Sequence, residues 1–599
     1  MKLFINYIEK DNLASLSVDN VEISWLEIQR LCEERAYGGS QVRYDSLTIP
    51  WWKFISLKSD LKFLFIKHNL QPILSDKVIS LLKESARFES QYKLALLSTP
   101  LAEDDISYKL KNKGFKRTLT DQQLRNVTKM SMLPAAATFS VPGAGKTTEA
   151  LAYFTLTSTP ETKLLVVAPK NAFIAWDDEI KECLYSQEEV IRLAGGYNNI
   201  QLLLKNKPKY SIITYQQLPN VLNLISEYLI ENDVFMFLDE SHRIKQGSSG
   251  IIGGSILSLS HLPKQKLIMS GTPMPNRVDD LISQFNFLYP EIHCTGDDIA
   301  NKIKPIYVRT TKKELNLDKN RKFSIHYVEM NPNQRKLYQL LCSEQARIAN
   351  KYLKSRDRTI LRNIGKSVLR MIQITSNPRL LANSDFSYHN ILKDVIREGD
   401  SPKIKYVCKR ARELAHDGKR VVIWSSFVNN VELIAERLSD LGAEYIHGQV
   451  ESGDENDPET REAKIRRFHN KEENCFVLVA NPAAASEGIS LHKVCNHAIY
   501  LDRNYNAAQF LQSMDRIHRL GLPENVISEI EIVACRDSID EIVHNRLFSK
   551  IQDMEVILND DSIQKEYEYF DEEVENINDI SEDDIIDYIN HLTQQGGEY

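Results

Sequence analysis

The sequence predicts an α/β protein with two parallel-sheet lobes in tandem, helical insertions, a small N-terminal α+β domain and an acidic C-terminal tail. Two sets of short apolar runs alternate with helical stretches, and strands that alternate with helices form parallel sheets. A glycine-rich loop opens a helix near residue 146, and an Asp-Glu pair ends a later apolar run. The chain of 599 residues is long enough for several domains.

The first set of apolar runs predicts a lobe over residues 116–325, and the second predicts a lobe over residues 401–555. The expected strands of the first lobe are Leu164–Ala168, Ser211–Tyr215, Val234–Leu238 and Lys266–Met269. Those of the second are Val421–Trp424, Phe476–Ala480, His497–Leu501 and Ile527–Val533. Residues 326–400 carry long helical patterns, which predict a helical insertion between the lobes.

Residues 1–115 contain no nucleotide motif and predict a small accessory domain of unassigned role. We expect strands at Lys2–Ile8 and Leu13–Val18, and helices at Leu61–Ile66 and Val78–Phe88. The adjacent Trp51 and Trp52 follow Pro50, and such an apolar pair more often belongs to a core than to a ligand site.

The C-terminal tail, residues 556–599, is predicted to be disordered apart from a short helix at Asp583–Leu592. Residues 551–599 hold sixteen acidic residues and one lysine, a net charge of −15. The whole chain carries −7, so residues 1–550 carry +8. A basic body suits a polyanionic partner. We favour a solvated tail over one that mimics nucleic acid or recruits a basic partner.

The composition predicts a cytoplasmic protein. No apolar run approaches the roughly 20 residues of a membrane span, and the first ten residues do not resemble a signal peptide. The eight cysteines are scattered and form no Cys-x-x-Cys pair. This pattern predicts reduced thiols and no zinc site.

The loop at residues 140–147 reads Ser-Val-Pro-Gly-Ala-Gly-Lys-Thr and predicts an ATP site. Two glycines let the backbone curl so that its N–H groups face phosphate, and the following helix adds its dipole. Lys146 is expected to reach the β and γ phosphates, and the Thr147 hydroxyl to bind Mg²⁺. The alternative is an ordinary glycine turn. The expected ATP contacts are Pro142, Gly143, Ala144, Gly145, Lys146, Thr147 and Thr148.

Asp239 and Glu240 end the apolar run Val234–Leu238, which predicts a buried parallel strand. The carboxyl ends of such strands are where open α/β sheets bind ligands. We expect Asp239 to hold Mg²⁺ and Glu240 to orient the attacking water. An isolated acidic pair is more often a solvated turn, but the phosphate loop makes the catalytic interpretation the better one.

The motifs together resemble, in order, those of the Swi/Snf-type branch of superfamily-two helicases over residues 115–550. The resembling segments of the first lobe and insertion are Leu119–Gln123, Ala168–Glu179 (motif Ia), Ile213–Gln217 (motif Ib), Asp239–Lys245 (motif II), Ser270–Asn276 (motif III), Phe285–Pro290, Val308–Lys312, Gln334–Tyr338 and Leu369–Pro378. In the second lobe they are Val421–Ser426 (motif IV), Asn481–Leu491 (motif V) and Gln512–Gly521 (motif VI). The departures are Ser140 in the loop, Ser486 and Glu487 in motif V, and Leu522 after motif VI.

This resemblance implies two RecA-like lobes and assigns further roles. Gln123 would read adenine, Gly488 would contact ATP, and Arg516 and Arg519 would be arginine fingers that catalyse with Lys146 and Glu240. The implied nucleic-acid contacts are Lys170, Asn171, Thr214, Ser426 and Ser490, each with strand-end capping as its alternative. The implied coupling residues are His242, Ser270, Thr272 and Gln512. For the arginines the alternative is one face of a surface helix that pairs with Asp515.

The resemblance implies an ATP- and Mg²⁺-dependent translocase on double-stranded DNA, of bacterial or phage type. It would remodel DNA or displace bound protein, in repair or anti-phage defence. One alternative is a partner-gated ATPase or DNA-binding subunit of a multi-protein defence complex, and another is a strand-separating helicase. DNA is the expected partner, with further proteins in a multi-subunit system and no membrane.

Overall fold

The computed structural model describes residues 2–36, 40–97, 103–185, 188–317, 321–355, 358–382, 386, 388–451, 457–470, 474–485, 491–519, 526–560 and 592. The chain divides into two compact units, residues 1–311 and 312–599. The predicted tail helix at Asp583–Leu592 and most of the acidic tail lie outside the described residues.

A small mixed sheet forms the N-terminal part of the first unit, in the strand order β3-β4-β2-β1-β5. Its strands are β1 Leu3–Ile8, β2 Leu13–Val18, β3 Gln41–Val42, β4 Ser46–Pro50 and β5 Ile73–Leu74. The helices beside it are α1 Ile23–Ala36, α2 Trp51–Ser56, α3 Lys58–Lys67 and α4 Asp76–Leu97. The predicted strands and helices are confirmed, and Trp51 and Trp52 are buried, as a core pair should be.

A seven-stranded sheet forms the centre of the first unit, in the order β12-β6-β11-β10-β7-β9-β8. All its pairings are parallel. The strands are β6 Ala135–Thr138, β7 Lys163–Ala168, β8 Val190–Arg192, β9 Tyr210–Thr214, β10 Val234–Asp239, β11 Gln265–Met269 and β12 Tyr307–Val308. The inner strands are apolar on both faces, which explains why each reads as an unbroken apolar run.

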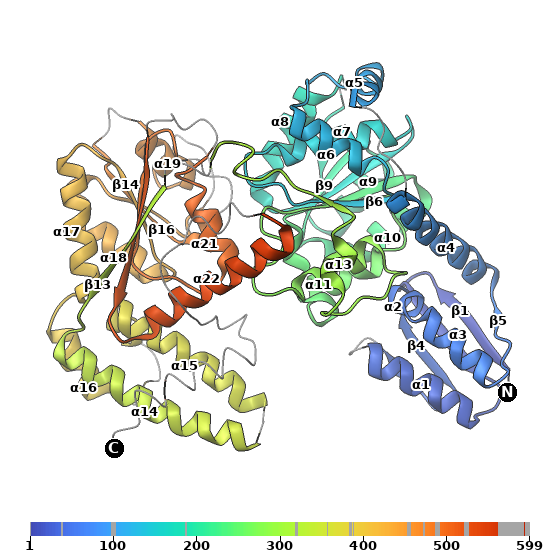
Figure 1. The fold of residues 1–599 in the computed structure, drawn as a ribbon, viewed down its shortest axis with the longest axis horizontal. Coiled ribbons are helices and arrows are strands. Elements are labelled where there is room, and N and C mark those ends of the chain that lie inside the picture. Colours follow the sequence, from blue (N-terminus) through green and yellow to red (C-terminus); the bar gives the residue numbers. More distant parts are fainter. Residues whose placement is uncertain are drawn as a thin grey trace. The chain divides into compact units, whose positions relative to one another are not determined.

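Helices connect these strands, and α4 runs from the small sheet toward this lobe (Figure 1). They are α5 Glu103–Asn112, α6 Asp121–Met130, α7 Lys146–Thr157, α8 Phe173–Cys183, α9 Tyr197–Lys205, α10 Leu222–Glu231, α11 Ile251–Leu259, α12 Asp280–Leu288 and α13 Ile299–Ile303. Tyr92 on α4 packs edge-on against Tyr289, with ring centroids 4.7 Å apart, and thereby joins the N-terminal domain to the lobe.

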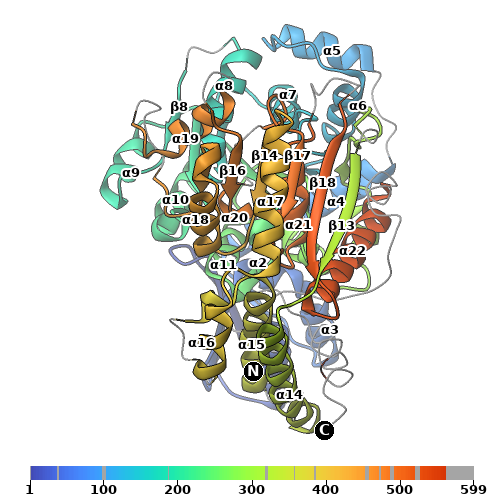
Figure 2. The same cartoon turned by 90° about the vertical axis from the view of Figure 1, so that its left-hand side faces the viewer.

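The second unit contains a six-stranded parallel sheet in the order β13-β18-β17-β14-β16-β15. Its strands are β13 Arg321–Val328, β14 Val421–Trp424, β15 Glu444–Ile446, β16 Val477–Ala480, β17 His497–Tyr500 and β18 Ser528–Cys535. The helices are α17 Pro402–His416, α18 Val428–Arg437, α19 Arg461–His469, α20 Pro482–Ala485, α21 Ala507–Met514 and α22 Ile539–Leu558. Helices α17 and α18 cover one face and α21 and α22 the other (Figures 1 and 2).

Three helices precede this sheet: α14 Pro332–Ser355, α15 Arg358–Ser376 and α16 His389–Arg397. They occupy the segment whose sequence predicts helices. All eight strands predicted from the apolar runs of the two lobes are present within one or two residues. No helix in the described part of the chain is long and apolar enough to cross a membrane.

Candidate functional site

The glycine-rich loop follows β6 and ends at the first turn of α7. Gly143 has φ +89° and Gly145 has φ +83°, and Gly145 is the residue that caps α7. Glycine adopts this left-handed conformation without steric cost, which explains both positions. The loop backbone therefore curls ahead of the helix N-terminus, where partial positive charge and unpaired N–H groups attract phosphate. Lys146, Thr147 and Thr148 form the first turn of α7.

Gln123 holds this loop from the side. It closes a capping box with Thr120 at the start of α6, and its Nε2 donates to the Ala144 carbonyl over 3.0 Å. A Cβ atom on Gly145 would lie 2.3 Å from the same Nε2. The close approach thus adds a second reason for glycine at residue 145.

Lys146 and motif III lie against each other at the loop. The Lys146 Nζ donates to the Ser140 carbonyl over 3.0 Å. A Cβ atom added to Gly271 would lie 3.6 Å from that Nζ and 2.9 Å from Cδ of Pro142. The contact follows from strand order, because β11 lies between β6 and β10 and all three end at the same sheet edge.

Asp239 is the last residue of β10 and is held by two aromatic side chains. The Trp176 indole donates to its Oδ2 over 3.0 Å, and the Tyr215 hydroxyl donates to its carbonyl over 2.7 Å. Burial and the adjacent Glu240 carboxylate raise the pKa of Asp239 to about 6. A bound cation would favour its ionised form, as a metal-binding carboxylate requires.

Glu240 has φ +53°, an uncommon conformation for a residue with a side chain. Its Oε2 lies 3.3 Å from Nδ1 of His242 and accepts from the Ser270 hydroxyl over 3.5 Å. The His242 Nδ1 and the Ser270 Oγ are 3.1 Å apart, and the Thr272 N–H donates to that Oγ over 3.2 Å. Burial opposes ionisation of Glu240, but His242 and Lys146 outweigh it and lower its pKa.

The Thr148 hydroxyl is engaged by two charged side chains. Its hydroxyl donates to Glu179 Oε2 over 2.8 Å and accepts from Arg117 over 2.9 Å. Arg117 also contacts Glu179 at 2.7 Å. The Thr147 side chain is partly exposed, and no hydrogen bond to another described residue is recorded for its hydroxyl.

A buried polar cluster lies beneath the loop. Glu149 is fully buried and accepts hydrogen bonds from Thr138 over 2.7 Å and from Asn126 over 2.8 Å. The Asn126 amide also reaches Thr310 over 2.9 Å. Burial raises the pKa of Glu149 to about 7. The cluster therefore ties α6, the loop, α7 and the segment after β12 together.

In the second unit, Arg516 and Arg519 follow α21 rather than belonging to it. The helix contains Gln512 and ends at Met514, and both arginines are partly exposed. The alternative that placed the two arginines on one helix face is wrong. The Arg516 carbonyl accepts from the Leu491 N–H over 2.9 Å, and Asp515 pairs with Lys312 at 2.9 Å. These contacts fix a turn.

Two family models match the chain in tandem. The SNF2-related domain matches residues 139–380, and the helicase conserved C-terminal domain matches residues 402–521. The first contains the loop and both acidic residues, and the second contains motifs IV to VI. The chain is a Swi/Snf-type ATPase.

Relatives of this Swi/Snf-type ATPase are distant in sequence. The "ATP-dependent DNA helicase DDM1" of Arabidopsis thaliana is 23% identical over 67% of this chain and 56% of that protein. An "Uncharacterized ATP-dependent helicase" of Mycoplasma pneumoniae is 23% identical over 63% and 35%. The chain spans about a quarter to a half of the length of such relatives. The Sulfolobus solfataricus SWI2/SNF2 ATPase core domain is 20% identical over 72% of this chain and 88% of that one, with a TM-score of 0.31.

The predicted nucleic-acid contacts of the first lobe lie at the same sheet edge as the ATP loop. Lys170 is exposed and Asn171 partly exposed just after β7, and Thr214 ends β9. The Thr214 hydroxyl accepts from the Gln217 N–H over 3.1 Å, which is the strand-end cap expected as its alternative. In the second unit, Ser426 follows β14 and its N–H donates to Asp502 over 2.6 Å.

Two predicted residues, Gly488 and Ser490, lie outside the described residues, as do the motif departures Ser486, Glu487 and Leu522. The residues that support the site rather than face it were not predicted from the sequence. These are Arg117, Trp176, Glu179, Tyr215, Glu149 and Asn126. Trp176 and Glu179 fall inside the motif Ia segment, so their spacing along α8 was the available signal.

Proposed function

We propose that the chain is an ATP-dependent translocase on double-stranded DNA that remodels DNA or displaces bound protein. The observation that carries the proposal is the convergence of Lys146, Asp239, Glu240 and Ser270 at the carboxyl edge of the seven-stranded sheet. Such a set serves phosphoryl transfer, in which positioning and charge stabilisation do most of the work.

The residues around the glycine-rich loop each have a role in this proposal. The curled backbone of Gly143 and Gly145 and the start of α7 hold phosphate oxygens, and Lys146 neutralises their charge. Thr147 and Asp239 supply the oxygen ligands that Mg²⁺ prefers. When bound, Mg²⁺ neutralises the charge that develops on the phosphates. Glu240 accepts the hydrogen bond of the attacking water, while His242 and Ser270 hold its carboxylate.

Arg516 and Arg519 complete the proposal as arginine fingers, with planar cations that stabilise the spread charge of the γ-phosphoryl group. Because the second unit carries them, hydrolysis would require the units to close on the nucleotide, and this requirement would couple chemistry to movement. Gln512 in α21 would relay that closure.

The DNA track rests on the family and on the named activity of relatives such as the "ATP-dependent DNA helicase DDM1". Lys170, Asn171, Thr214, Ser426 and Ser490 would contact backbone phosphates. Such contacts are independent of sequence and weaken with salt. A place in DNA repair or anti-phage defence stays a prediction from the resemblance.

The E240Q variant tests the motor directly. A motor should keep ATP binding, lose turnover by about 100-fold or more, and fail to displace a triplex-forming strand from duplex DNA. Triplex displacement by E240Q at the wild-type rate would instead support a nucleotide-gated scaffold. Unwinding of a forked duplex by the wild-type chain would support the strand-separating helicase.

A further inference from the structure

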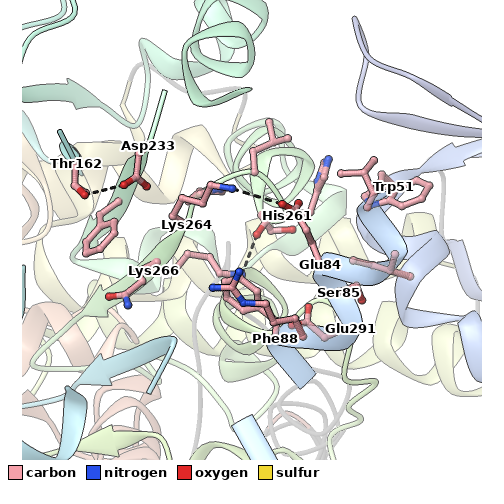
Figure 3. Close-up of a pocket in the computed structure, with 18 of the residues that line it drawn as sticks. Trp51, Glu84, Ser85, Phe88, Thr162, Asp233, His261, Lys264, Lys266 and Glu291 are labelled. Atoms are coloured by element: carbon pink, nitrogen blue, oxygen red, sulfur yellow. Dashed lines mark hydrogen bonds and ion pairs between the residues drawn. The ribbon is translucent and has the colours of Figure 1, made fainter. Parts of the chain in front are cut away.

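A cavity lies at the amino ends of the strands of the seven-stranded sheet, opposite the ends that carry the ATP loop. Its volume is about 350 Å³, and its walls come from α2 and α4 of the N-terminal domain and from the starts of β7, β10 and β11 (Figure 3). Thr162 and Asp233 lie toward one end and Trp51 toward the other. The ATP site does not use any of these residues. The volume is at the lower end of the range for small-molecule pockets.

The cavity lining holds an unusual number of buried polar atoms without partners. Ser85 Oγ, Ser260 Oγ, His261 Nδ1, Gln265 Oε1 and Glu291 Oε1 form no hydrogen bond with a described residue. Ser85, Ser260 and Glu291 are 8%, 0% and 6% exposed. Roughly nine in ten buried polar groups in proteins have a partner. Five such atoms around one cavity can therefore form hydrogen bonds with a polar molecule that enters it.

The interior also contains a buried lysine and a buried glutamate, which attract each other but lie beyond ion-pair distance. Lys266 is 2% exposed, and neither it nor Glu291 forms an ion pair with a described residue. The Lys266 Nζ donates to the Ser260 carbonyl over 2.9 Å and lies 5.0 Å from the centre of the Phe88 ring. Burial lowers the pKa of Lys266 to about 8 and raises that of Glu291.

These charges restrict the chemistry of a ligand. Glu291 would repel a simple anion, and Lys266 would repel a simple cation, whereas a neutral molecule would offer neither group an opposite charge at ion-pair distance. A zwitterion satisfies both. Apolar side chains of Trp51, Leu81 and Phe235 supply the remaining wall.

We propose that this cavity binds a small zwitterion of the α-amino-acid class with an apolar side chain. Its carboxylate would pair with Lys266 and its ammonium group with Glu291, while its side chain packs on the aromatic wall. Its side chain would contact Trp51 of α2 and Leu81 of α4, and the bound molecule would so hold the N-terminal domain on the lobe. This site is independent of the proposed translocase activity.

Isothermal titration calorimetry of the full chain with each of the twenty common L-amino acids tests the proposal. We expect at least one apolar amino acid to bind at one site per chain. Its N-acetyl and carboxamide derivatives, each lacking one charge, should bind at least about tenfold more weakly, the size expected for a lost charge-assisted hydrogen bond. Absence of binding by all twenty, or equal binding by both derivatives, would overturn the proposal.

Variants place the ligand in this cavity. K266M and E291Q should each weaken binding about tenfold or more. K264M changes a half-exposed lysine at the rim, which pairs with Glu84 at 3.5 Å, and should bind as wild type. Undiminished binding in both K266M and E291Q would contradict the assignment. If either variant fails to fold, the derivative series on the wild-type chain decides.

Discussion

The indole N–H of Trp176 donates a hydrogen bond to the Asp239 carboxylate over 3.0 Å. The two residues lie 63 positions apart, on α8 and at the end of β10. The bond fixes the orientation of a carboxylate that we propose as a ligand of Mg²⁺. Partners of this kind orient metal ligands and tune their affinity.

W176F should therefore weaken magnesium use. The phenyl ring keeps the packing but removes the donor, so we expect the Mg²⁺ concentration for half-maximal ATP hydrolysis to rise about 10- to 100-fold. W424F is the matched control, because the buried Trp424 Nε1 has no hydrogen-bond partner in the described structure. A magnesium titration of W176F that coincides with that of wild type would show that Trp176 does not affect the use of Mg²⁺.

Ser270 links the segment Ser270–Asn276 to Glu240, which we propose as the catalytic glutamate, because its hydroxyl contacts both Glu240 and His242. S270A should leave ATP binding intact and reduce the stimulation of hydrolysis by DNA about tenfold. S258A removes a hydroxyl that bonds only within α11 and serves as the control. Equal stimulation of S270A and wild type would show that this contact does not couple DNA to hydrolysis.

Gly145 is required by its positive φ, and a side chain there would also displace Gln123 from its hydrogen bond to Ala144. G145A would bring a Cβ atom within 2.3 Å of Gln123 Nε2 at φ +83°, so we expect loss of ATP binding. G418A also creates an alanine at positive φ, +70°, but has no atom within 4 Å. It should cost about 1–2 kcal/mol of stability and keep ATP binding. Fluorescent nucleotide titration of both variants separates the clash from the backbone strain.

Glu149 should make stability depend on pH. Its folded pKa of about 7 lies above the ordinary 4.5, so the folded state binds this proton more tightly than the unfolded state. The contribution to stability is therefore full below pH 4.5 and is lost as the pH rises through 7. Between pH 5 and pH 8 the loss amounts to about 2–3 kcal/mol.

E149Q stays neutral and should escape this loss. In urea unfolding, the free energy of unfolding of E149Q relative to wild type should rise by about 2–3 kcal/mol between pH 5 and pH 8. E227Q changes an exposed glutamate of the same lobe, and its free energy of unfolding should match that of wild type at pH 5 and at pH 8. A constant difference between E149Q and wild type across this range would mean that Glu149 is ionised throughout.

The strands and the phosphate loop were predictable because each depends on a short stretch of sequence. Val234–Leu238 is apolar and buried on both faces, and a run of this length and composition most often forms a buried strand. The edge strands β8, β12 and β13 were missed because none of them forms a long buried apolar run. β13 alternates between partly exposed and exposed residues, and β8 and β12 have only three and two residues. Their pairing depends on neighbours that are remote in sequence.

The supporting contacts of the site were not predictable from local pattern. Glu149 is a polar residue that the sequence gives no reason to bury, and its partner Asn126 lies 23 positions away on another helix. The turn at Arg516 is similarly set by Leu491, a residue 25 positions earlier. The cavity beside Lys266 depends on α4 packing against β11, which local sequence does not specify.

ATP hydrolysis measured at fixed salt without nucleic acid, and with single-stranded DNA, blunt duplex DNA and RNA, tests the central claim most directly. We expect duplex DNA to stimulate ATP hydrolysis by the wild-type chain strongly, and K146A to show no hydrolysis above background under any condition. Failure of all three nucleic acids to stimulate the wild-type chain would contradict the translocase and favour an ATPase that a protein partner activates.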